Sequence, residues 1–430
     1  MDYDFDVIVV GAGVAGSVAA TALARQGHEV LLVERGTEPG AKNLSGGVFY
    51  SRVMDEVFPG FAQAAPVERV ITRNTLSFLN AASAVNIDYW DQRLASPVNA
   101  VSVLRAHLDP WLAEQAEEAG VSLISGVKVD RLLRGDTHFY GIEAAGEEMT
   151  TKVVIAADGV NSFLAQGAGV RAKQPTKNLG LGIKSVIQIG EDAVRERFNL
   201  TGSEGAAYAL VGDATMGVPG GGFMYTNRDS VSIGVVLMLE RLTASGLTSS
   251  DIHDHLLSHP FLAPFLEGGE LLEYGCHLVA EGGQAMQEGI VHDGLILIGD
   301  AAGFTLNTGL TVRGMDLAAG SALAASKAVH AALEAGDYSR LALQAYVDEY
   351  EATFVGKDMH TYRHAPGFLE NAPLMFGPAG RLAAEVFYGV YNHDLRPRRH
   401  IAKVALDAMR GSGVRMSELV TTSLRALRAL

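Results

Sequence analysis

The chain has 430 residues, 48% of them hydrophobic, which is enough to build a large core in two or three domains. Its 34 Lys and Arg residues against 49 Asp and Glu residues give a formal net charge of −15. This charge excludes broad nucleic-acid binding, because a phosphate backbone requires a basic face. The single cysteine, Cys276, excludes an intrachain disulfide, a cysteine-ligated iron–sulfur cluster and a structural zinc site, and we expect it to be a small buried side chain.

The first residues argue against export and membrane insertion. The segment MDYDFDVIVV carries acidic residues where a secretory signal carries basic ones. No apolar stretch reaches the roughly 18 residues that a membrane span requires. We therefore expect a cytoplasmic protein, or one that binds peripherally to the cytoplasmic face of a membrane.

The first 35 residues follow a strand, helix, strand pattern. Residues 5–10 (FDVIVV) form a continuous apolar run, which is typical of a strand buried on both faces. Residues 17–26 (SVAATALARQ) predict a helix that ends at Gly27, and residues 28–35 (HEVLLVER) predict a second buried strand. The three elements complete a β–α–β unit within about thirty residues.

Gly11, Gly13 and Gly16 form a G-x-G-x-x-G turn between the first strand and the helix. The first glycine permits the tight turn, the second lets the backbone approach a pyrophosphate, and the third lets helix and strand pack closely. The N-terminus of the helix then presents N–H groups and a partial positive charge to the phosphates. Glu34 ends the second strand, where a carboxylate accepts hydrogen bonds from the adenosine ribose. The pattern predicts a dinucleotide site, in preference to a glycine-rich turn with a surface glutamate.

A second element, IGDAAG at residues 298–303, favours FAD over NAD. Asp300, at the end of a buried strand, can hold ribityl hydroxyls, and the loop that follows can direct N–H groups to the pyrimidine edge of the flavin. NAD proteins have no need of this distant segment. A flavin supplies the redox chemistry itself, so we expect neither a catalytic acid or base nor a metal.

The remaining patterns divide the chain into three regions. We expect an α/β fold in which a Rossmann-type FAD-binding domain, of the glutathione-reductase-like kind, is formed by residues 1–177 and 286–336. Alternating segments such as 230–240 (SVSIGVVLMLE) predict an inserted α+β substrate domain with an antiparallel sheet over residues 178–285. Residues 337–430 should be mostly helical.

Four stretches give the chain a family resemblance: PGAKNLSGGVFY (39–50), HPFLAPFLEGGELLEYGCHLVAEGG (259–283), GDAAGFTLNTGLTVRGMDLA (299–318) and FVGKDMHTYRHAPGFLENAP (354–373). The chain resembles the geranylgeranyl-reductase-like branch of FAD-dependent oxidoreductases and, within it, the FixC-type electron-transfer-flavoprotein–quinone oxidoreductases. The resemblance implies electron flow from electron transfer flavoprotein subunits, through FAD, to a membrane quinone that the second domain would accept. It also implies a ferredoxin-like iron–sulfur protein, which we expect on a separate chain because this one lacks the cysteine-rich domain of fused relatives.

The resemblance also assigns residues around the cofactor. It places Ala15 and Glu34 at the dinucleotide, Arg105 at the FAD, Val129 at the adenine through its backbone, Ser45 and Gly46 near the flavin, Asp300 at the ribityl chain, and the backbone N–H groups of Thr311 and Val312 at the flavin O2 and N1 edge. Lys42 and Asn43 are either flavin-proximal or solvated loop residues. Arg35, Asp158, Gly299 and Gly309 complete the expected cofactor-binding set.

Several alternatives stay open. His360 and His364 are spaced to share one helix face, but without an evident third ligand a structural or quinone-site role is favoured over metal binding. Residues 396–428 hold eight Arg and Lys against Asp407 and Glu418, a local charge of +6 that fits anionic lipid headgroups, a docking partner or a solvated helix face. The rival functions are a flavin-dependent reductase or tailoring enzyme acting on an apolar small molecule such as a prenyl chain, and a flavin-bearing structural subunit, and fold class cannot decide between them.

Overall fold

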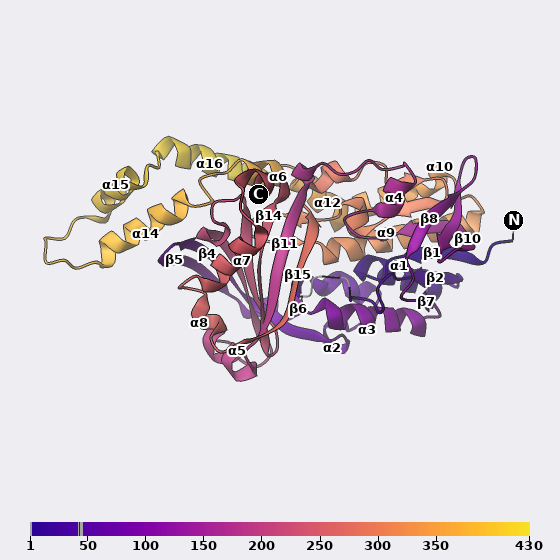
Figure 1. Cartoon of the computed structure of the whole chain (residues 1–430), viewed down its shortest axis with the longest axis horizontal. Helices are drawn as coiled ribbons and strands as arrows, with labels where there is room; N and C mark the ends of the chain where they lie inside the picture. The colour runs from indigo at the N-terminus through magenta and orange to yellow at the C-terminus, as the bar shows by residue number, and fades with distance from the viewer. Residues whose placement is uncertain (1, 42, 44–45) are drawn as a thin grey trace.

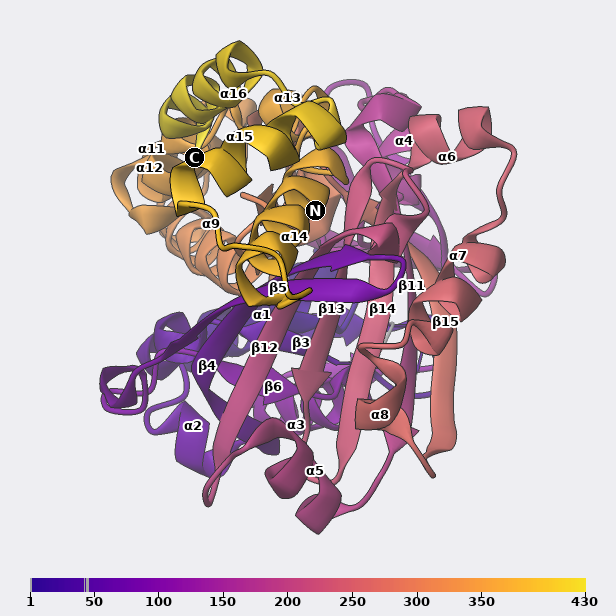
Figure 2. The same ribbon diagram turned by 90° about the vertical axis from the view of Figure 1, so that its left-hand side faces the viewer.

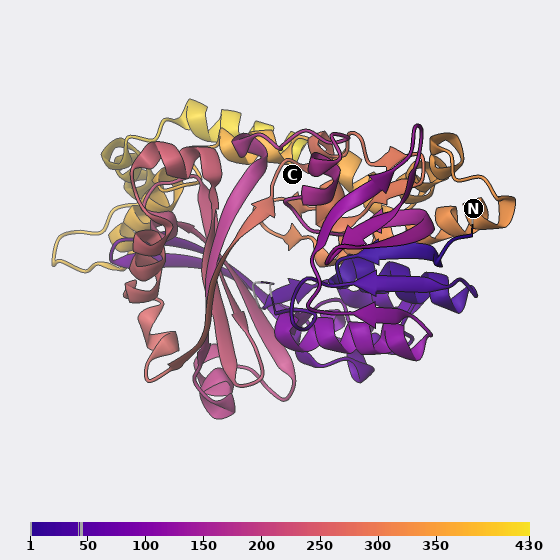
Figure 3. The ribbon, with the colours of Figure 1, turned by 45° about the vertical axis from the view of Figure 1, so that its right-hand side comes forward.

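The computed structural model of the chain describes residues 2–41, 43 and 46–430. Two sheets lie side by side along the long axis of the molecule (Figures 1 and 3). The one near the N-terminus is sandwiched by helices, and the other is broader and lies in the middle of the molecule. Helices from the C-terminal part of the chain run along one side of both, which agrees with the helical region expected after residue 337.

The first sheet is mainly parallel and carries the predicted β–α–β unit. Its strands are β16 (Val291–His292), β17 (Leu295–Leu297), β10 (Glu147–Ala156), β1 (Phe5–Val10), β2 (Val30–Val33) and β7 (Ser122–Ile124), in that order. The pairs β17–β10, β10–β1, β1–β2 and β2–β7 are parallel, and β16 is antiparallel to β17. An antiparallel ribbon of β8 (Val129–Arg134) and β9 (Phe139–Ala144) extends β10.

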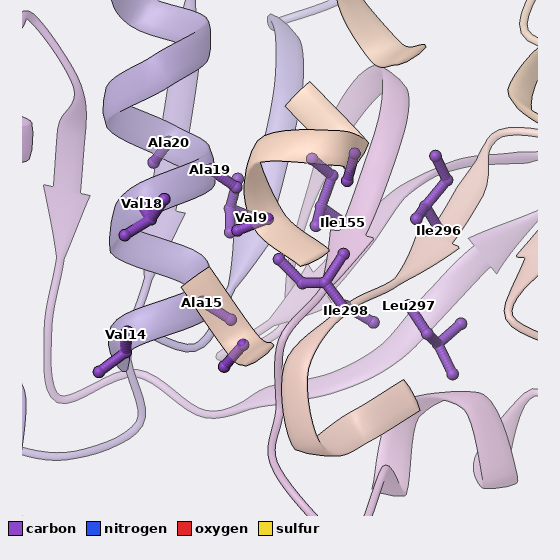
Figure 4. Packing of buried hydrophobic residues seen from close by; sticks show 14 of the residues in the cluster. Val9, Val14, Ala15, Val18, Ala19, Ala20, Ile155, Ile296, Leu297 and Ile298 are labelled. Carbon is purple, nitrogen blue, oxygen red and sulfur yellow. The ribbon is translucent and has the colours of Figure 1, made fainter. Parts of the chain in front are cut away.

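Helix α1 (Val14–Arg25) packs against both α3 (Arg105–Glu118) and α9 (Met315–Ala335) beside this sheet. The side chains of β1 from Val7 to Val10 are at most 7% exposed, which explains the unbroken apolar run in the sequence. Small side chains on α1 let the helix lie close to the strands. Figure 4 shows Ala15 and Ala19 of α1 on the side of the helix that faces the strands, with Ala19 beside Val9.

The second sheet is broad and strongly twisted (Figure 2). Its strands run in the order β15 (Glu270–Ala280), β11 (Leu179–Gln188), β14 (Ser230–Met238), β13 (Gly220–Thr226), β12 (Glu204–Gly212), β4 (Val67–Asn80), β6 (Val101–Val103) and β3 (Gly47–Phe49), with β5 (Ser83–Trp90) paired to β4. Four of these strands come from residues 47–103, a segment that the sequence analysis assigns to the dinucleotide domain. The pair β12–β4 is parallel, so the sheet is mixed and not purely antiparallel as expected. The long connection between β4 and β12 passes through the first sheet, and this leaves the relative direction of the two strands unconstrained by a hairpin.

Short helices cover the outer face and edges of the second sheet, and the rest of the chain is helical. The helices not yet named are α2 (Phe61–Ala64), α4 (Phe163–Gly167), α5 (Glu191–Phe198), α6 (Leu239–Ser245), α7 (Ser249–Ser258), α8 (Ala263–Leu266), α10 (Arg340–Leu343), α11 (Ala345–Ala352), α12 (Phe354–Thr361), α13 (Ala365–Glu370), α14 (Pro378–Tyr391), α15 (Ile401–Ser412) and α16 (Met416–Ala429). Among the described residues, no helix combines the length and the apolar character needed to cross a bilayer.

Candidate functional site

The glycine turn after β1 is packed against the end of β10. Gly11 has a φ of +106°, and a Cβ at this position would lie 2.4 Å from the carbonyl oxygen of Ala157. A Cβ on Gly16 would lie 1.8 Å from the Gly11 carbonyl oxygen. Gly13 caps α1 without any side-chain hydrogen bond, so the first turn of the helix faces the pocket beside it through its backbone. The turn is therefore a cradle that only glycine permits, as a pyrophosphate site requires.

Glu34 connects the glycine turn to the loop after β2. Its Oε2 accepts a hydrogen bond from the Ala12 N–H at 3.0 Å, and its Oε1 accepts one from the Gly36 N–H at 2.6 Å. The carboxylate lines the same pocket as the turn. Two backbone donors thus fix its position and leave further lone pairs for ribose hydroxyls.

The two distant sequence motifs are in direct contact. A short 3-10 helix, η6 (Gly299–Ala302), follows β17, and Gly299 has a φ of +57°. A Cβ on Gly299 would lie 2.8 Å from the Cβ of Ala15 in the first turn of α1. Figure 4 shows Ala15 beside Ile298, at the end of β17. The segment around residue 300 therefore closes the pocket that the N-terminal glycine turn opens.

This pocket runs along the carboxyl ends of β1, β2, β10 and β17, the usual ligand site of an open α/β sheet. Most of the predicted residues line it: Gly11, Gly13, Ala15, Glu34, Arg35, Asn43, Arg105, Val129, Asp158, Asp300 and Val312. Gly16, Gly46, Gly299, Gly309 and Thr311 are not in its lining, and Gly16 and Gly299 act by packing. The predictions for Lys42 and Ser45 fall outside the described residues.

Arg105 supplies a fixed cation to the pocket. Its Nε and Nη2 lie 2.5 and 2.7 Å from the two carboxylate oxygens of Asp109, which is fully buried. The Asn43 amide donates a third hydrogen bond to Asp109 at 2.6 Å. Burial opposes the charged form of Arg105, but the pairing with Asp109 raises its pKa above the ordinary value. A Cβ on Gly13 would lie 3.2 Å from Arg105 Nη2, so the guanidinium borders the phosphate cradle.

Two carboxylates that line the pocket, Asp158 and Asp300, lie where burial opposes their charged form. The Oδ2 of Asp158 accepts from the Leu164 N–H at 3.0 Å, whereas its Oδ1 is buried without a partner among the described residues. Burial raises the pKa of Asp158 and of Asp300, and for Asp300 the charges of Arg105 and His277 oppose that rise. Buried acceptors without donors fit the hydroxyl-rich chain of a dinucleotide. These acceptors and the glycine cradle together fit the cofactor that the sequence predicts.

The segment expected at the flavin edge forms a small hairpin of β18 (Leu306–Asn307) and β19 (Val312–Arg313). The Thr311 N–H donates to the Thr308 hydroxyl at 3.1 Å, and the Thr308 N–H donates to the Thr311 carbonyl at 3.0 Å. The Thr311 N–H is therefore hydrogen-bonded within the hairpin. Val312 does line the pocket and is 47% exposed.

Sequence reasoning missed three polar residues, two beside this hairpin and one beside Gly46. Glu281 and Asn307 line the pocket and are joined by a hydrogen bond, and both fall inside stretches that carry the family resemblance. Lys184, on β11, donates to the Gly46 carbonyl, and burial lowers its pKa to about 7. The signal for Lys184 was present in the sequence, as one lysine within the apolar strand LGLGIKSVIQ.

Two minor expectations can be compared with the structure. Cys276 is exposed, not buried as expected, because β15 is the edge strand of its sheet and this side chain points outward. His360 is exposed on α12, which ends at Thr361, and His364 is exposed in the turn before α13, so the two do not share one helix face as the spacing predicted. Across the described residues there is no group of three or more His, Cys, Asp or Glu side chains able to hold a metal ion.

Comparisons with known proteins agree with the geometry. Residues 4–195 match the model of a family described as an FAD binding domain. The chain is 43% identical over 406 residues to the probable electron transfer flavoprotein-quinone oxidoreductase YdiS of Escherichia coli K12, covering 94% of both chains, and 42% identical over 391 residues to protein FixC of the same strain, covering 91% of both. In fold it is similar to a geranylgeranyl bacteriochlorophyll reductase-like protein from Thermoplasma acidophilum, with a TM-score of 0.69 and 18% identity over 95% of this chain and 96% of the other.

Proposed function

The chain belongs to the FAD-dependent oxidoreductase family of FixC and the electron transfer flavoprotein–quinone oxidoreductases, and on that premise we propose that it passes electrons from an electron transfer flavoprotein to a quinone. The observation that carries the proposal is the contact between Gly299 and Ala15, which joins both cofactor motifs in one pocket. When bound there, FAD supplies the capacity to accept and release electrons.

Different residues of the pocket would bind different parts of FAD. The first turn of α1 and the Arg105 guanidinium would bind the pyrophosphate, because they provide backbone N–H groups and a fixed positive charge. Glu34 would accept hydrogen bonds from the adenosine ribose. Asp300 and Asp158 would accept hydrogen bonds from hydroxyls, which for Asp158 would satisfy the Oδ1 that lacks a donor among the described residues.

The two sheets suggest which part of the chain binds FAD and which part binds the quinone. We propose that the first sheet, with its helices, is the glutathione-reductase-like FAD domain formed largely by residues 1–177 and 286–336. The second sheet would be the quinone domain, built on residues 178–285 and on the strands from 47–103. The pocket lining includes His277, Val279 and Glu281 at the end of β15, so the quinone domain reaches the cofactor there.

We further propose partners and a location. An iron–sulfur cluster of this electron pathway would lie on a separate ferredoxin-like chain, because the single cysteine cannot ligate one. The loop joining α14 and α15 would contact an anionic membrane surface in a peripheral manner. Helices α14 and α15 project beyond the second sheet at the end farthest from the N-terminus (Figure 1). Tyr391, Leu395 and Ile401 are 75%, 102% and 67% exposed there.

Charge supports this membrane contact. The exposed apolar side chains are interspersed with Arg396, Arg398, Arg399 and Lys403, on a protein that is acidic as a whole. Basic residues near an anionic surface contribute about 1 kcal/mol each. The chain should sediment with phosphatidylglycerol vesicles and not with phosphatidylcholine vesicles, and Ile401→Glu should weaken binding. Leu341→Glu, at a still more exposed apolar site on α10 (85% against 67% for Ile401), is the control. Equal binding of both variants would refute the contact.

The experiment that tests the proposed function combines the purified, FAD-loaded chain with reduced electron transfer flavoprotein and a short-chain quinone, without oxygen. We expect quinol to form only when both the flavoprotein and the FAD-loaded chain are present. The proposal is overturned if quinone stays oxidised. Turnover of a prenylated substrate driven by a nicotinamide alone would instead identify a stand-alone reductase.

A further inference from the structure

Glu281 is an acid held at the pocket by two different elements. It follows β15 directly, and its backbone N–H donates to the Asn178 carbonyl at 2.8 Å. Its Oε2 accepts from the Asn307 amide of β18 at 3.2 Å. The oxygen of the Asn307 amide accepts a hydrogen bond from the Gly309 N–H at 2.8 Å. The hairpin thus holds the Asn307 side chain in place, and that side chain holds Glu281 through its own hydrogen bond.

The surroundings of Glu281 favour its neutral form. Burial raises the pKa of Glu281 to about 7, against a smaller opposite effect of the Asn307 hydrogen bond. Its stem packs against Gly180, where a Cβ would lie 3.1 Å from the Glu281 Cγ. The residues that hold it, Asn178, Gly180 and Asn307, carry no charge. The acid therefore sits in a low-dielectric position and is still only partly covered on its pocket side.

Among the cations that line the pocket with Glu281, Arg105, Lys128 and Arg313 are paired with other carboxylates, and Arg35 acts on Asp158. Arg313 lies 2.6 Å from an oxygen of Asp316 and 2.5 Å from one of Asp358. Arg105 is paired with Asp109 at the phosphate end, and the remaining titratable groups of the lining near β15, His277 and Asp300, act on each other. Val279, Leu306 and Val312 add apolar surface beside the acid. A carboxylic acid beside apolar walls matches a quinone ring with an oxygen to be protonated.

We propose, on the basis of the proposed function, that Glu281 donates a proton to the quinone oxygen during reduction to the quinol. The reaction requires two electrons and two protons. Bound FAD in its reduced form would supply both electrons and one proton as a hydride equivalent. Glu281 would supply the second proton, because the O–H bond to the second quinone oxygen would form as the Glu281 O–H bond breaks. Solvent then returns a proton to the carboxylate. Glu281 is thus a catalytic residue, because its proton neutralises the negative charge that the quinone oxygen gains during reduction.

The test compares Glu281→Gln with Glu288→Gln, an exposed glutamate seven positions along the chain. The FAD of each variant is reduced chemically and its reoxidation is followed with a quinone and with ferricyanide, which takes electrons without protons. We expect Glu281→Gln to slow reoxidation by quinone by roughly 100-fold and reoxidation by ferricyanide not at all. Wild-type rates with quinone should fall as the pH rises through about 7, since the neutral acid is the donor, and the variant should lose this dependence. Glu281→Asp, which keeps an acid, should recover part of the rate.

A second readout is independent of turnover. Infrared spectra of the protein during a pH titration should contain a carboxylic acid C=O band that disappears near neutral pH and is missing in Glu281→Gln. Equal slowing with quinone and ferricyanide, or an unchanged quinone rate, overturns the role of Glu281. A wild-type protein that reduces ferricyanide but not quinone overturns the proposed function itself, and with it this role, so the two failures are distinguishable.

Discussion

Replacing Lys184 with methionine should change how the stability of the protein depends on pH. Lys184 is 4% exposed, and burial lowers its pKa from 10.5 to about 7, with the charge of Glu273 opposing the shift. Between these two values the unfolded chain binds more protons than the folded one. The stability of the protein with respect to this group is therefore highest above about pH 10.5, falls as the pH falls from there to about 7, and changes no further below about 7.

The size of the effect follows from that shift. Between about pH 6 and about pH 9, Lys184 alone should raise the free energy of unfolding by about 3 kcal/mol. Urea unfolding of the FAD-loaded protein at both pH values measures the free energy of unfolding of Lys184→Met and of the wild type. The difference between these two free energies should shrink by about this amount as the pH rises. Lys177→Met, at an exposed lysine, should keep the wild-type dependence. If the free energy of unfolding of Lys184→Met depended on pH as that of the wild type does, the lowered pKa of Lys184 would be refuted.

Three further predictions concern the cofactor cradle. Gly16→Ala places a Cβ 1.8 Å from the Gly11 carbonyl oxygen and should cost about 1–3 kcal/mol of FAD binding, measured by fluorescence titration, while Gly411→Ala, in open space, leaves the affinity unchanged. Glu34→Gln should weaken the binding of FAD by about 1.5–3 kcal/mol and leave the binding of FMN, which lacks the adenosine, unchanged. An equal loss of affinity for FAD and FMN would contradict the contact between Glu34 and the ribose. Arg105→Met leaves the Asp109 carboxylate buried without its cation and should destabilise the protein by about 3–5 kcal/mol in urea unfolding, part of which an added Asp109→Leu restores.

The parts of the fold that depend on local patterns were predictable from the sequence. The β1–α1–β2 unit, the glycine turn and Glu34 lie within 35 residues, and each has a backbone or packing requirement that the residue types reveal. Asp300 and Gly299 were predicted as cofactor residues because a second motif, IGDAAG, lies far along the chain. In the structure this motif touches α1 through Gly299, which explains why both glycine-rich turns are needed.

The parts that depend on long-range pairing were not predictable in this way. The parallel pairing of β4 with β12 joins residues more than a hundred positions apart, and no hairpin fixes its direction. Glu281 and Asn307 are single polar residues far apart in the sequence. Their pairing is visible only in the structure, where the Asn307 amide lies 3.2 Å from the Glu281 carboxyl oxygen. The exposure of Cys276 follows from the edge position of β15, which a periodic pattern does not reveal.

The most direct test of the account is a titration of the purified, folded chain with FAD. One FAD should bind per chain with the yellow colour and quenched fluorescence of an enclosed flavin, and both Gly16→Ala and Asp300→Ala, from opposite ends of the sequence, should weaken that single binding event. Folded protein that stays colourless and takes up no FAD would contradict the shared pocket and every function proposed for it.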